Sequence, residues 1–258
     1  GHAAVVRIDG LISSETDASA ETVDWESFLG PAPKKPFSLE RFFRWRCYWD
    51  YSGGIATDLF VHLMTTIHYV MGATVPELVV ATGANYRHQK THEVPDTLNA
   101  SAVYGKERFL VSLSATFNSA AGNESGFSIL GSEGSLAMRG DRLILTPEHP
   151  VEGNDWVVAS WPAALERAYW ADPEVQKRER PDSWPSAMQS RGESWQEVGP
   201  DSTLLHMARF FDSVRTRKPS VQDGRLGHHA AAVAHMVNES IRRQTPVRWD
   251  FARAVLQA

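Results

Sequence analysis

Hydrophobic and polar residues alternate along the middle of the chain, whereas the regions before and after it show the wider spacing of helices. Alternation over residues 3–12 predicts a first strand. Further strands are predicted at residues 77–86, 97–105 and 108–119, with three short ones within 126–148. Because these later strands follow one another with only turns between them, we expect antiparallel hairpins and not a doubly wound parallel sheet.

Three long helices are predicted. The first covers residues 54–71 and is apolar for about five turns. The second occupies residues 201–220, with Asp201 or Ser202 as its cap, and the third residues 223–245. Their expected apolar faces comprise Leu204, Ala208, Phe211 and Val214 in the second helix, and Leu226, Ala230, Val233, Val237 and Ile241 in the third.

Two segments lack both patterns. Residues 13–45 are rich in proline and aromatic side chains, and we expect an extended, linker-like segment there. Residues 149–200 contain five of the nine tryptophans together with several prolines. We expect an irregular excursion with one helix near residues 162–170, packed by its aromatic side chains. We expect residues 1–258 as a whole to form a single domain.

The composition excludes several classes of protein. With 258 residues, 42% of them hydrophobic and 22% charged, the chain has the make-up of a globular protein with a sizeable core. A net charge of -5 argues against nucleic acid as the main partner. No apolar run approaches the roughly 18 residues of a membrane span. The single cysteine, Cys47, excludes an internal disulfide and a cysteine-rich metal site.

The chain opens at Gly1 without a methionine or a signal peptide. We therefore expect it to be a piece of a longer polypeptide, in which any targeting segment would precede Gly1. Both a cytoplasmic and an exported protein remain open.

Polar side chains form one narrow stripe on the first helix. At about 100° per residue, His62, Thr65 and Tyr69 fall within about 40° of Asp58. The opposite half of the helix carries Leu59, Phe60, Leu63, Met64, Ile67 and Val70. We therefore expect the stripe to face away from a core that takes the other half.

The stripe has a structural and a functional interpretation. In the structural one, Asp58 is a cap or an ion-pair partner and His62 is a hydrogen-bonded core histidine. In the functional one, Asp58 lies in the first turn, where the helix dipole favours a carboxylate. Gly53 and Gly54 would then let the backbone approach a ligand closely.

An aspartate and a histidine four residues apart fit either a metal site or proton transfer. A metal usually needs three or more ligands. The other such pair, His88 and His92, lies in a predicted loop between strands, so we expect no metal. In the second chemistry an imidazole that titrates near neutral pH takes a proton from a substrate hydroxyl, and the carboxylate orients or assists it.

Four segments in order resemble one family of enzymes. Residues 50–72, DYSGGIATDLFVHLMTTIHYVMG, resemble the GG-x-x-x-D-x-x-x-H helix that opens the second domain of NAD(P)-dependent oxidoreductases of the glucose–fructose oxidoreductase, inositol dehydrogenase and MocA type. The segments VDWESFLGPAP and RFFRWR are similar to the W-x-x-x-L-G-P-A-P linker of one branch. FSILGSEGSLAM is similar to an I-x-G-x-x-G-x-L hairpin, and residues 206–250 to the two closing helices.

The resemblance implies a fold and a second domain. The C-terminal domain of this family is an α/β (α+β) unit, with helices on one face of an open, mainly antiparallel β-sheet, as in GAPDH-like dehydrogenases. The other face often serves for homo-oligomerisation. NAD or NADP is bound mainly by an N-terminal Rossmann domain with a lysine in an E-K-P motif. Neither that motif nor a G-x-G-x-x-G after a strand occurs here, so we expect this chain alone to be inactive.

The resemblance also implies roles for individual residues. His62 would be the general base at a hydroxyl of a sugar, polyol or related compound, and Asp58 its partner in proton relay or substrate binding. Many members carry an acid where this chain has Thr65. Further contacts are expected from Thr65, Tyr69, Arg46 and Trp45 with the substrate, and from Gly53 and Gly54 with the cofactor.

Three functions remain open. The first is the substrate-binding, catalytic half of an oxidoreductase acting on a small carbohydrate-like compound. The second is a redox-neutral, NAD-dependent hydrolysis of glycosides, as some relatives perform. The third is a non-catalytic binding or scaffold domain, which Thr65 and the missing Rossmann domain favour. We expect no nucleic acid or membrane partner for any of them.

Overall fold

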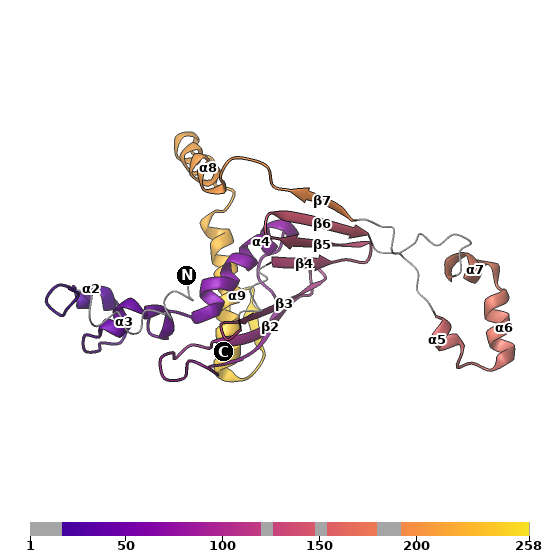
Figure 1. The fold of residues 1–258 in the computed structure, drawn as a ribbon, viewed down its shortest axis with the longest axis horizontal. Helices are drawn as coiled ribbons and strands as arrows, with labels where there is room; N and C mark the ends of the chain where they lie inside the picture. The colour runs from indigo at the N-terminus through magenta and orange to yellow at the C-terminus, as the bar shows by residue number, and fades with distance from the viewer. Residues whose placement is uncertain (1–16, 120–125, 148–153, 180–191, 258) are drawn as a thin grey trace. The chain divides into compact units, whose positions relative to one another are not determined.

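The chain is described by a computed structural model that covers residues 17–119, 126–147, 154–179 and 192–257 (Figure 1). These residues divide into two compact units: unit 1 ends at residue 123 and resumes at 205, and unit 2 comprises residues 124–204. The strand predicted at residues 3–12 lies outside the described residues. The single domain predicted over residues 1–258 stays a prediction, and the two units are described one at a time.

Five strands form the sheet of unit 1. They are β1 (Leu78–Ala84), β2 (Thr97–Tyr104), β3 (Phe109–Thr116), β8 (Val247–Asp250) and β9 (Val255–Leu256). Their order is β3-β2-β1-β8-β9, and every pair is antiparallel. The three central strands that alternation predicts are confirmed, and each pairs antiparallel with the strand that follows it in the sequence.

The two faces of this sheet differ in character. Val79 pairs with Ala102 and Ala100 pairs with Leu113, so these four side chains share one face, and all four are buried. Small polar residues alternate with them on the opposite face. They are Thr82, Asn99, Ser101, Ser112 and Ser114.

Two helices cover the buried face. α4 (Val61–Met71) continues from a π-helical turn, η2 (Ala56–Phe60), and packs on α9 (Gly224–Arg243), which in turn packs on β1 (Figure 1). The buried core residues include Phe60, Met64, Val79, Leu98, Val233 and Val237. The first and third predicted helices are therefore confirmed, together with the side of each that faces the core.

α8 (Ser202–Thr216) is the remaining predicted helix, and Asp201 caps it by accepting hydrogen bonds from two backbone N–H groups of its first turn. Its apolar face is exposed in the described structure, since Leu204 is 63% exposed and Phe211 47% exposed. Neither α8 nor any other helix in the described ranges has the length and apolar character needed to cross a bilayer.

The segment before α4 is more regular than the linker that the sequence predicts. It contains α2 (Trp25–Leu29), α3 (Leu39–Phe43) and a 3-10 turn, η1 (Trp45–Cys47). The ring of Phe28 lies 5.0, 5.1 and 5.4 Å from those of Trp25, Phe42 and Tyr51. Stacked and edge-to-face contacts of this kind stabilise a segment that has few aliphatic side chains of its own.

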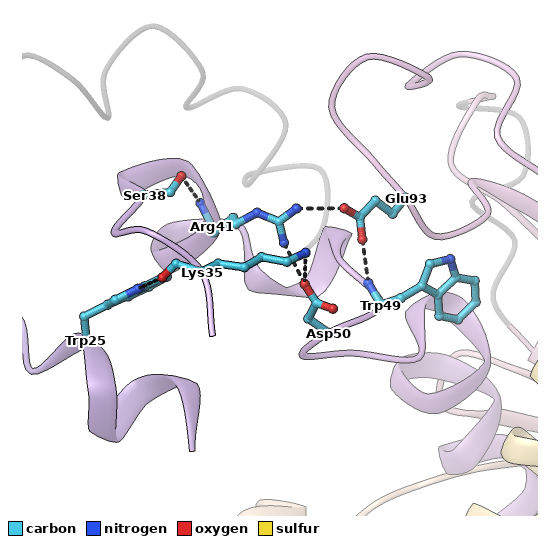
Figure 2. Close-up of polar contacts among 7 residues, drawn as sticks. All are labelled: Trp25, Lys35, Ser38, Arg41, Trp49, Asp50 and Glu93. Carbon is cyan, nitrogen blue, oxygen red and sulfur yellow. Dashed lines mark hydrogen bonds and ion pairs between the residues drawn. The ribbon is translucent and has the colours of Figure 1, made fainter. Parts of the chain in front are cut away.

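Arg41 joins this segment to the loop before β2. Its guanidinium lies 3.0 Å from Asp50 Oδ2 and 2.8 Å from Glu93 Oε1, and Lys35 binds the same oxygen of Asp50 (Figure 2). Glu93 also accepts a hydrogen bond from the Trp49 N–H at 3.2 Å. Because one side chain links three stretches of chain, these ion pairs act as a network, which is worth more than isolated surface pairs.

Unit 2 contains a second antiparallel sheet, with strand order β4-β5-β6-β7. Its strands are β4 (Gly126–Leu130), β5 (Gly134–Arg139), β6 (Arg142–Pro147) and β7 (Glu193–Gln196). The three short strands predicted within residues 126–148 are confirmed, and so is the predicted fold class. The strands form two sheets and not one. Among the described residues, β3 pairs only with β2 and β4 only with β5, so β3 and β4 are not paired with each other.

The Trp-rich part of unit 2 contains three helices: α5 (Asp155–Val158), α6 (Ala163–Ala171) and α7 (Pro173–Glu179). α6 confirms the helix expected near residues 162–170, whereas α5, α7 and β7 were not predicted. The buried Glu179 side chain accepts hydrogen bonds from Tyr169 and Asn154. The Tyr169 hydroxyl, helped by Arg178 and Asn154, outweighs burial and lowers the pKa of Glu179 to about 2.

One buried side chain of α4 is a histidine. His68 is 1% exposed, and its Nε2 lies 2.6 Å from the hydroxyl of Tyr104 on β2. Burial, and then the nearby His229, lower the pKa of His68 to about 4. Burial also raises the pKa of Tyr104. Both partners are therefore neutral at pH 7, as a pair inside an apolar core requires.

This pair predicts an acid-dependent loss of stability. The unfolded chain protonates His68 near pH 6.5, and the folded chain only near pH 4, so the unfolded state binds more protons between these values. Stability is full above about pH 6.5 and falls by up to about 3 kcal/mol on the way to pH 4. Urea unfolding at a series of pH values measures this slope.

The matched variants are His68→Gln, which keeps a hydrogen-bonding group beside Tyr104 but does not titrate, and His235→Gln at an exposed position of α9. We expect the first to flatten the slope between pH 6.5 and 4 and the second to leave it unchanged. Equal slopes for wild type and His68→Gln would contradict the assignment.

Candidate functional site

Two glycines, Gly53 and Gly54, lie just before η2 and α4, at what we call the entrance to α4, and they make different contacts. Gly53 donates its N–H to Thr57 Oγ1 at 3.0 Å, and its carbonyl accepts a hydrogen bond from Asn238 Nδ2 at 2.9 Å. A Cβ on Gly53 would lie 2.5 Å from that Asn238 nitrogen. Gly54 has φ +61°, and a Cβ there would lie 2.8 Å from the Cβ of Val94. Contacts within the chain therefore explain both glycines.

These contacts bear on the predicted cofactor role. The Gly53 N–H is taken by Thr57 and the Gly54 N–H by Ser52 Oγ at 3.1 Å, so neither points freely at an anion. A pyrophosphate needs such N–H groups at a helix N-terminus. The described residues here do not fit a phosphate cradle, and a contact of Gly53 or Gly54 with a cofactor stays a prediction.

Asp58 lies in the π-helical turn and forms an ion pair with Arg46. Arg46 Nε is 3.3 Å from Asp58 Oδ1, with the two side chains 41% and 26% exposed. The guanidinium also stacks on the ring of Trp45, 4.1 Å from its centroid. The structure therefore brings together three predicted site residues from two elements, η1 and η2. π-helical turns are rare in helices and often occur at functional sites.

His62 follows one turn later and faces solvent, as does Tyr69, which is 60% exposed. Within the described residues the structure gives the His62 ring no hydrogen-bond partner. The Thr65 hydroxyl donates to the Val61 carbonyl of its own helix at 2.7 Å. The stripe thus lies on the open side of α4, and the roles of its residues stay predictions.

Two positions on α4 differ from the helical-wheel expectation. Val70 was placed on the core side but is 53% exposed, in the last turn of a helix that ends at Met71. His68 is buried, and it was not among the residues predicted for the polar stripe. Its position four residues after Met64, on the buried side, is the signal that would have found it.

The loop between β1 and β2 is held by a buried carboxylate. Asp96 accepts hydrogen bonds from the backbone N–H groups of Tyr86, Arg87 and His88 and from Asn118 Nδ2. Burial raises the pKa of Asp96, but these donors, led by the Arg87 N–H, outweigh it and lower the pKa overall. Asp96 is a structural residue that the sequence analysis missed.

His88 and His92 lie in this loop, with ring centroids 4.7 Å apart. Across the part of the chain that the structure describes, no group of three or more histidine, cysteine, aspartate or glutamate side chains is placed to hold a metal ion. The His88 and His92 pair therefore has no third ligand among the described residues, which a metal site would need.

A comparison with known protein families shows the class of domain to which the chain belongs. The family described as "Oxidoreductase family, C-terminal alpha/beta domain" matches residues 21–248, so the chain belongs to this family, of the glucose–fructose oxidoreductase, inositol dehydrogenase and MocA type. No curated protein matches the chain.

Solved structures of low identity share the fold. A putative oxidoreductase from Thermotoga maritima is 15% identical with a TM-score of 0.54, over 83% of this chain and 52% of that one. Aldose-aldose oxidoreductase from Caulobacter crescentus, complexed with glycerol, is 12% identical with a TM-score of 0.53, over 84% of this chain and 52% of that one. Levoglucosan dehydrogenase, in complex with NADH and levoglucosan, is 19% identical with a TM-score of 0.51, over 79% of this chain and 52% of that one. The chain spans about half the length of these structures.

The entrance to α4 predicts unequal costs for two glycine substitutions. Gly54 and Gly72 both have positive φ, +61° and +64°, but a Cβ at Gly72 would meet nothing within 4 Å. Gly72→Ala should cost about 1 kcal/mol of unfolding free energy for the backbone alone. Gly54→Ala should cost about 3 kcal/mol, because the clash with Val94 adds to the backbone strain. Chemical denaturation compares the two, and equal costs would show that Val94 does not constrain the entrance.

Proposed function

We propose that this chain is the substrate-binding and catalytic half of an NAD(P)-dependent oxidoreductase that acts on a sugar, a polyol or a related hydroxy compound. The observation that carries the proposal is the exposed His62 one helical turn after Asp58, whose carboxylate is held by Arg46. Membership in an oxidoreductase family supports the reaction type. The levoglucosan dehydrogenase complex, which contains NADH and levoglucosan, supports the cofactor and the substrate class.

His62 takes the proton in this proposal. Its ring is exposed and without a partner in the described structure, so a substrate hydroxyl can reach a ring nitrogen directly. Loss of the hydroxyl proton to His62 turns the carbinol into a carbonyl as hydride leaves its carbon. The nicotinamide ring, held by a part of a longer protein, would accept that hydride. This chain supplies the base and the orientation.

Asp58 and Arg46 orient the substrate. The ion pair fixes the Asp58 carboxylate beside the Arg46 guanidinium, which keeps further N–H donors for ring or hydroxyl oxygens of the substrate. Thr65 donates its proton to Val61, so its hydroxyl oxygen can accept one from a ligand. The exposed Tyr69 ring at the end of the stripe offers an apolar face to the carbon skeleton.

The test is the His62→Ala variant of an enzyme that contains this chain and its nucleotide-binding domain. A general base contributes about 10²- to 10⁴-fold, so kcat should fall by that factor while KM changes little. His235→Ala, an exposed histidine on α9, is the control and should keep the wild-type rate. Wild-type kcat/KM in His62→Ala would exclude His62 as the base.

We also propose that the chain assembles as a homo-oligomer through the open face of the sheet in unit 1. None of the residues of β1, β2 and β3 is charged. Exposed sheet faces that remain monomeric usually carry charged side chains, which oppose association. The open face instead offers small polar side chains, with exposed Val80 and Leu110 among them. Such a face suits contact with a second copy of itself.

Ser101 and Ser112 pair across β2 and β3 near the middle of this face, so a charge there would be buried on assembly. Ser101→Arg should convert the oligomer to a monomer, measured by sedimentation or light scattering at micromolar concentration. Gln222→Arg, in an exposed loop, should leave the mass unchanged. A wild-type chain that is monomeric under these conditions would exclude the proposal.

A further inference from the structure

A pocket of about 480 Å³ opens in the segment that precedes α4, apart from the stripe of His62. It is lined by Phe28, Leu29, Pro31, Ala32, Trp45, Asp50 and Tyr51. Small-molecule sites in proteins have volumes of about 300 to 1,000 Å³ and combine apolar walls with a few polar groups. This pocket has both properties, and of its lining residues only Trp45 has a predicted role, as a substrate contact.

The walls of the pocket are held in place by contacts within the segment. The indole N–H of Trp25 donates to the Lys35 carbonyl at 2.7 Å, which closes the chain around α2 (Figure 2). The Ala32 N–H donates to the Leu29 carbonyl at 2.9 Å, which sets the turn through Pro31. The pocket is therefore pre-formed, and a ligand does not have to order its walls.

Asp50 supplies the polar wall. Its Oδ2 binds Lys35 and Arg41, while its other carboxylate oxygen points away from both cations (Figure 2). No donor to this second oxygen occurs among the described residues, so it is available to accept a hydrogen bond from a ligand hydroxyl. The charges of Lys35 and Arg41 are balanced by those of Asp50 and Glu93. This balance favours an uncharged ligand.

Aromatic rings supply the apolar wall. Phe28, Trp45 and Tyr51 all line the pocket. A pyranose ring has an apolar face of C–H groups, which packs on the electron-rich face of an aromatic ring, and a rim of hydroxyls, which a carboxylate oxygen binds. Three rings beside one available carboxylate oxygen match that combination better than they match a purely apolar or a charged ligand.

We propose that this pocket binds an uncharged pyranose ring, with Trp45 as its platform and Asp50 as its hydroxyl acceptor. Trp45 stacks on Arg46, and Arg46 binds Asp58, so the pocket lies two side chains from the acid of the stripe. A second sugar ring of a glycoside held here would direct the reacting ring toward His62. The binding step stands on the pocket alone, and only this connection to His62 rests on the proposed function.

The experiment titrates cellobiose and methyl β-D-glucopyranoside into the ¹⁵N-labelled 258-residue chain and follows the indole N–H resonances. We expect saturable, millimolar binding that moves the Trp45 resonance, and NOEs from sugar protons to the rings of Trp45 and Tyr51. Glucuronate should bind several-fold more weakly than the neutral glucoside, because its charge has no counterpart in the balanced wall. No saturable binding up to the solubility of either sugar, or no NOE to Trp45, would overturn the proposal.

Three variants locate the bound sugar. Ala32→Leu fills the pocket and should weaken cellobiose binding about tenfold or more, a cost of at least about 1.4 kcal/mol. Ala32→Ser keeps the volume and should bind as wild type. His62→Ala removes the proposed base and tests whether the sugar binds at the stripe instead of in the pocket. If Ala32→Leu unfolds the segment, the NOEs in the wild-type chain decide alone.

The same variants separate this proposal from the function proposed for the stripe. Loss of binding in His62→Ala with unchanged binding in Ala32→Leu would place the sugar at the stripe and overturn the pocket, while the catalytic role of His62 would stand. Sugar binding that Ala32→Leu abolishes would support the pocket even if His62→Ala proved fully active in the longer enzyme.

Discussion

The hydrogen bond from the Asn238 side chain to the Gly53 carbonyl sets the position at which α4 begins, and the candidate site depends on that helix. The bond joins residues 185 positions apart in the chain, so it couples the entrance of α4 to the last long helix. A side chain at Gly53 would displace Asn238, because a Cβ there would lie 2.5 Å from the Asn238 amide nitrogen. The sequence suggests that the two glycines let a ligand come close to the backbone. In the structure they also let Asn238 and Val94 pack closely against it.

The outward direction of the stripe follows from what lies behind it. Phe60 and Met64 are buried, with exposures of 1% and 0%, and truncating such side chains typically costs 2–5 kcal/mol each. Rotating α4 to hide His62 would expose them, which no hydrogen bond of a single histidine offsets. The packing energy of the core thus holds His62 in solvent. The same core accommodates His68 only as the neutral partner of Tyr104.

The sequence predicted those parts of the molecule where a local pattern and the tertiary environment agree. The alternation in β1, β2 and β3 found the strands because each pairs with its neighbour in sequence. The wheel found the open side of α4 because Phe60 and Met64 lie opposite His62. It could not find the π-helical turn around Asp58, since hydrophobic spacing does not show one additional residue in a turn.

Other features depend on partners distant in the chain, and those the sequence could not show. The ion pair of Arg46 and Asp58 joins two elements across the glycines, and the loop carboxylate of Asp96 acts through backbone donors that carry no residue signature. The helices α5 and α7 are short, with seven residues or fewer, below the length at which periodicity separates a helix from a loop. The apolar spacing of α8 predicted the helix correctly, although its apolar residues are exposed in the described structure.

Residues 45–52 connect the segment that contains α2 and α3 to the helix that carries Asp58 and His62. Their turn carries Trp45 and Arg46 at its start and leads directly into the glycines of α4, while Asp50 within it anchors two cations of the preceding segment. The ion pairs of Asp50 therefore restrain the same stretch of backbone that places the Arg46 guanidinium beside Asp58. A change in the segment that contains α2 and α3 would therefore shift the Arg46 guanidinium beside Asp58 through this turn, without any movement of α4. This short connection is the physical reason why the segment before α4 and the ion pair of Arg46 with Asp58 depend on each other.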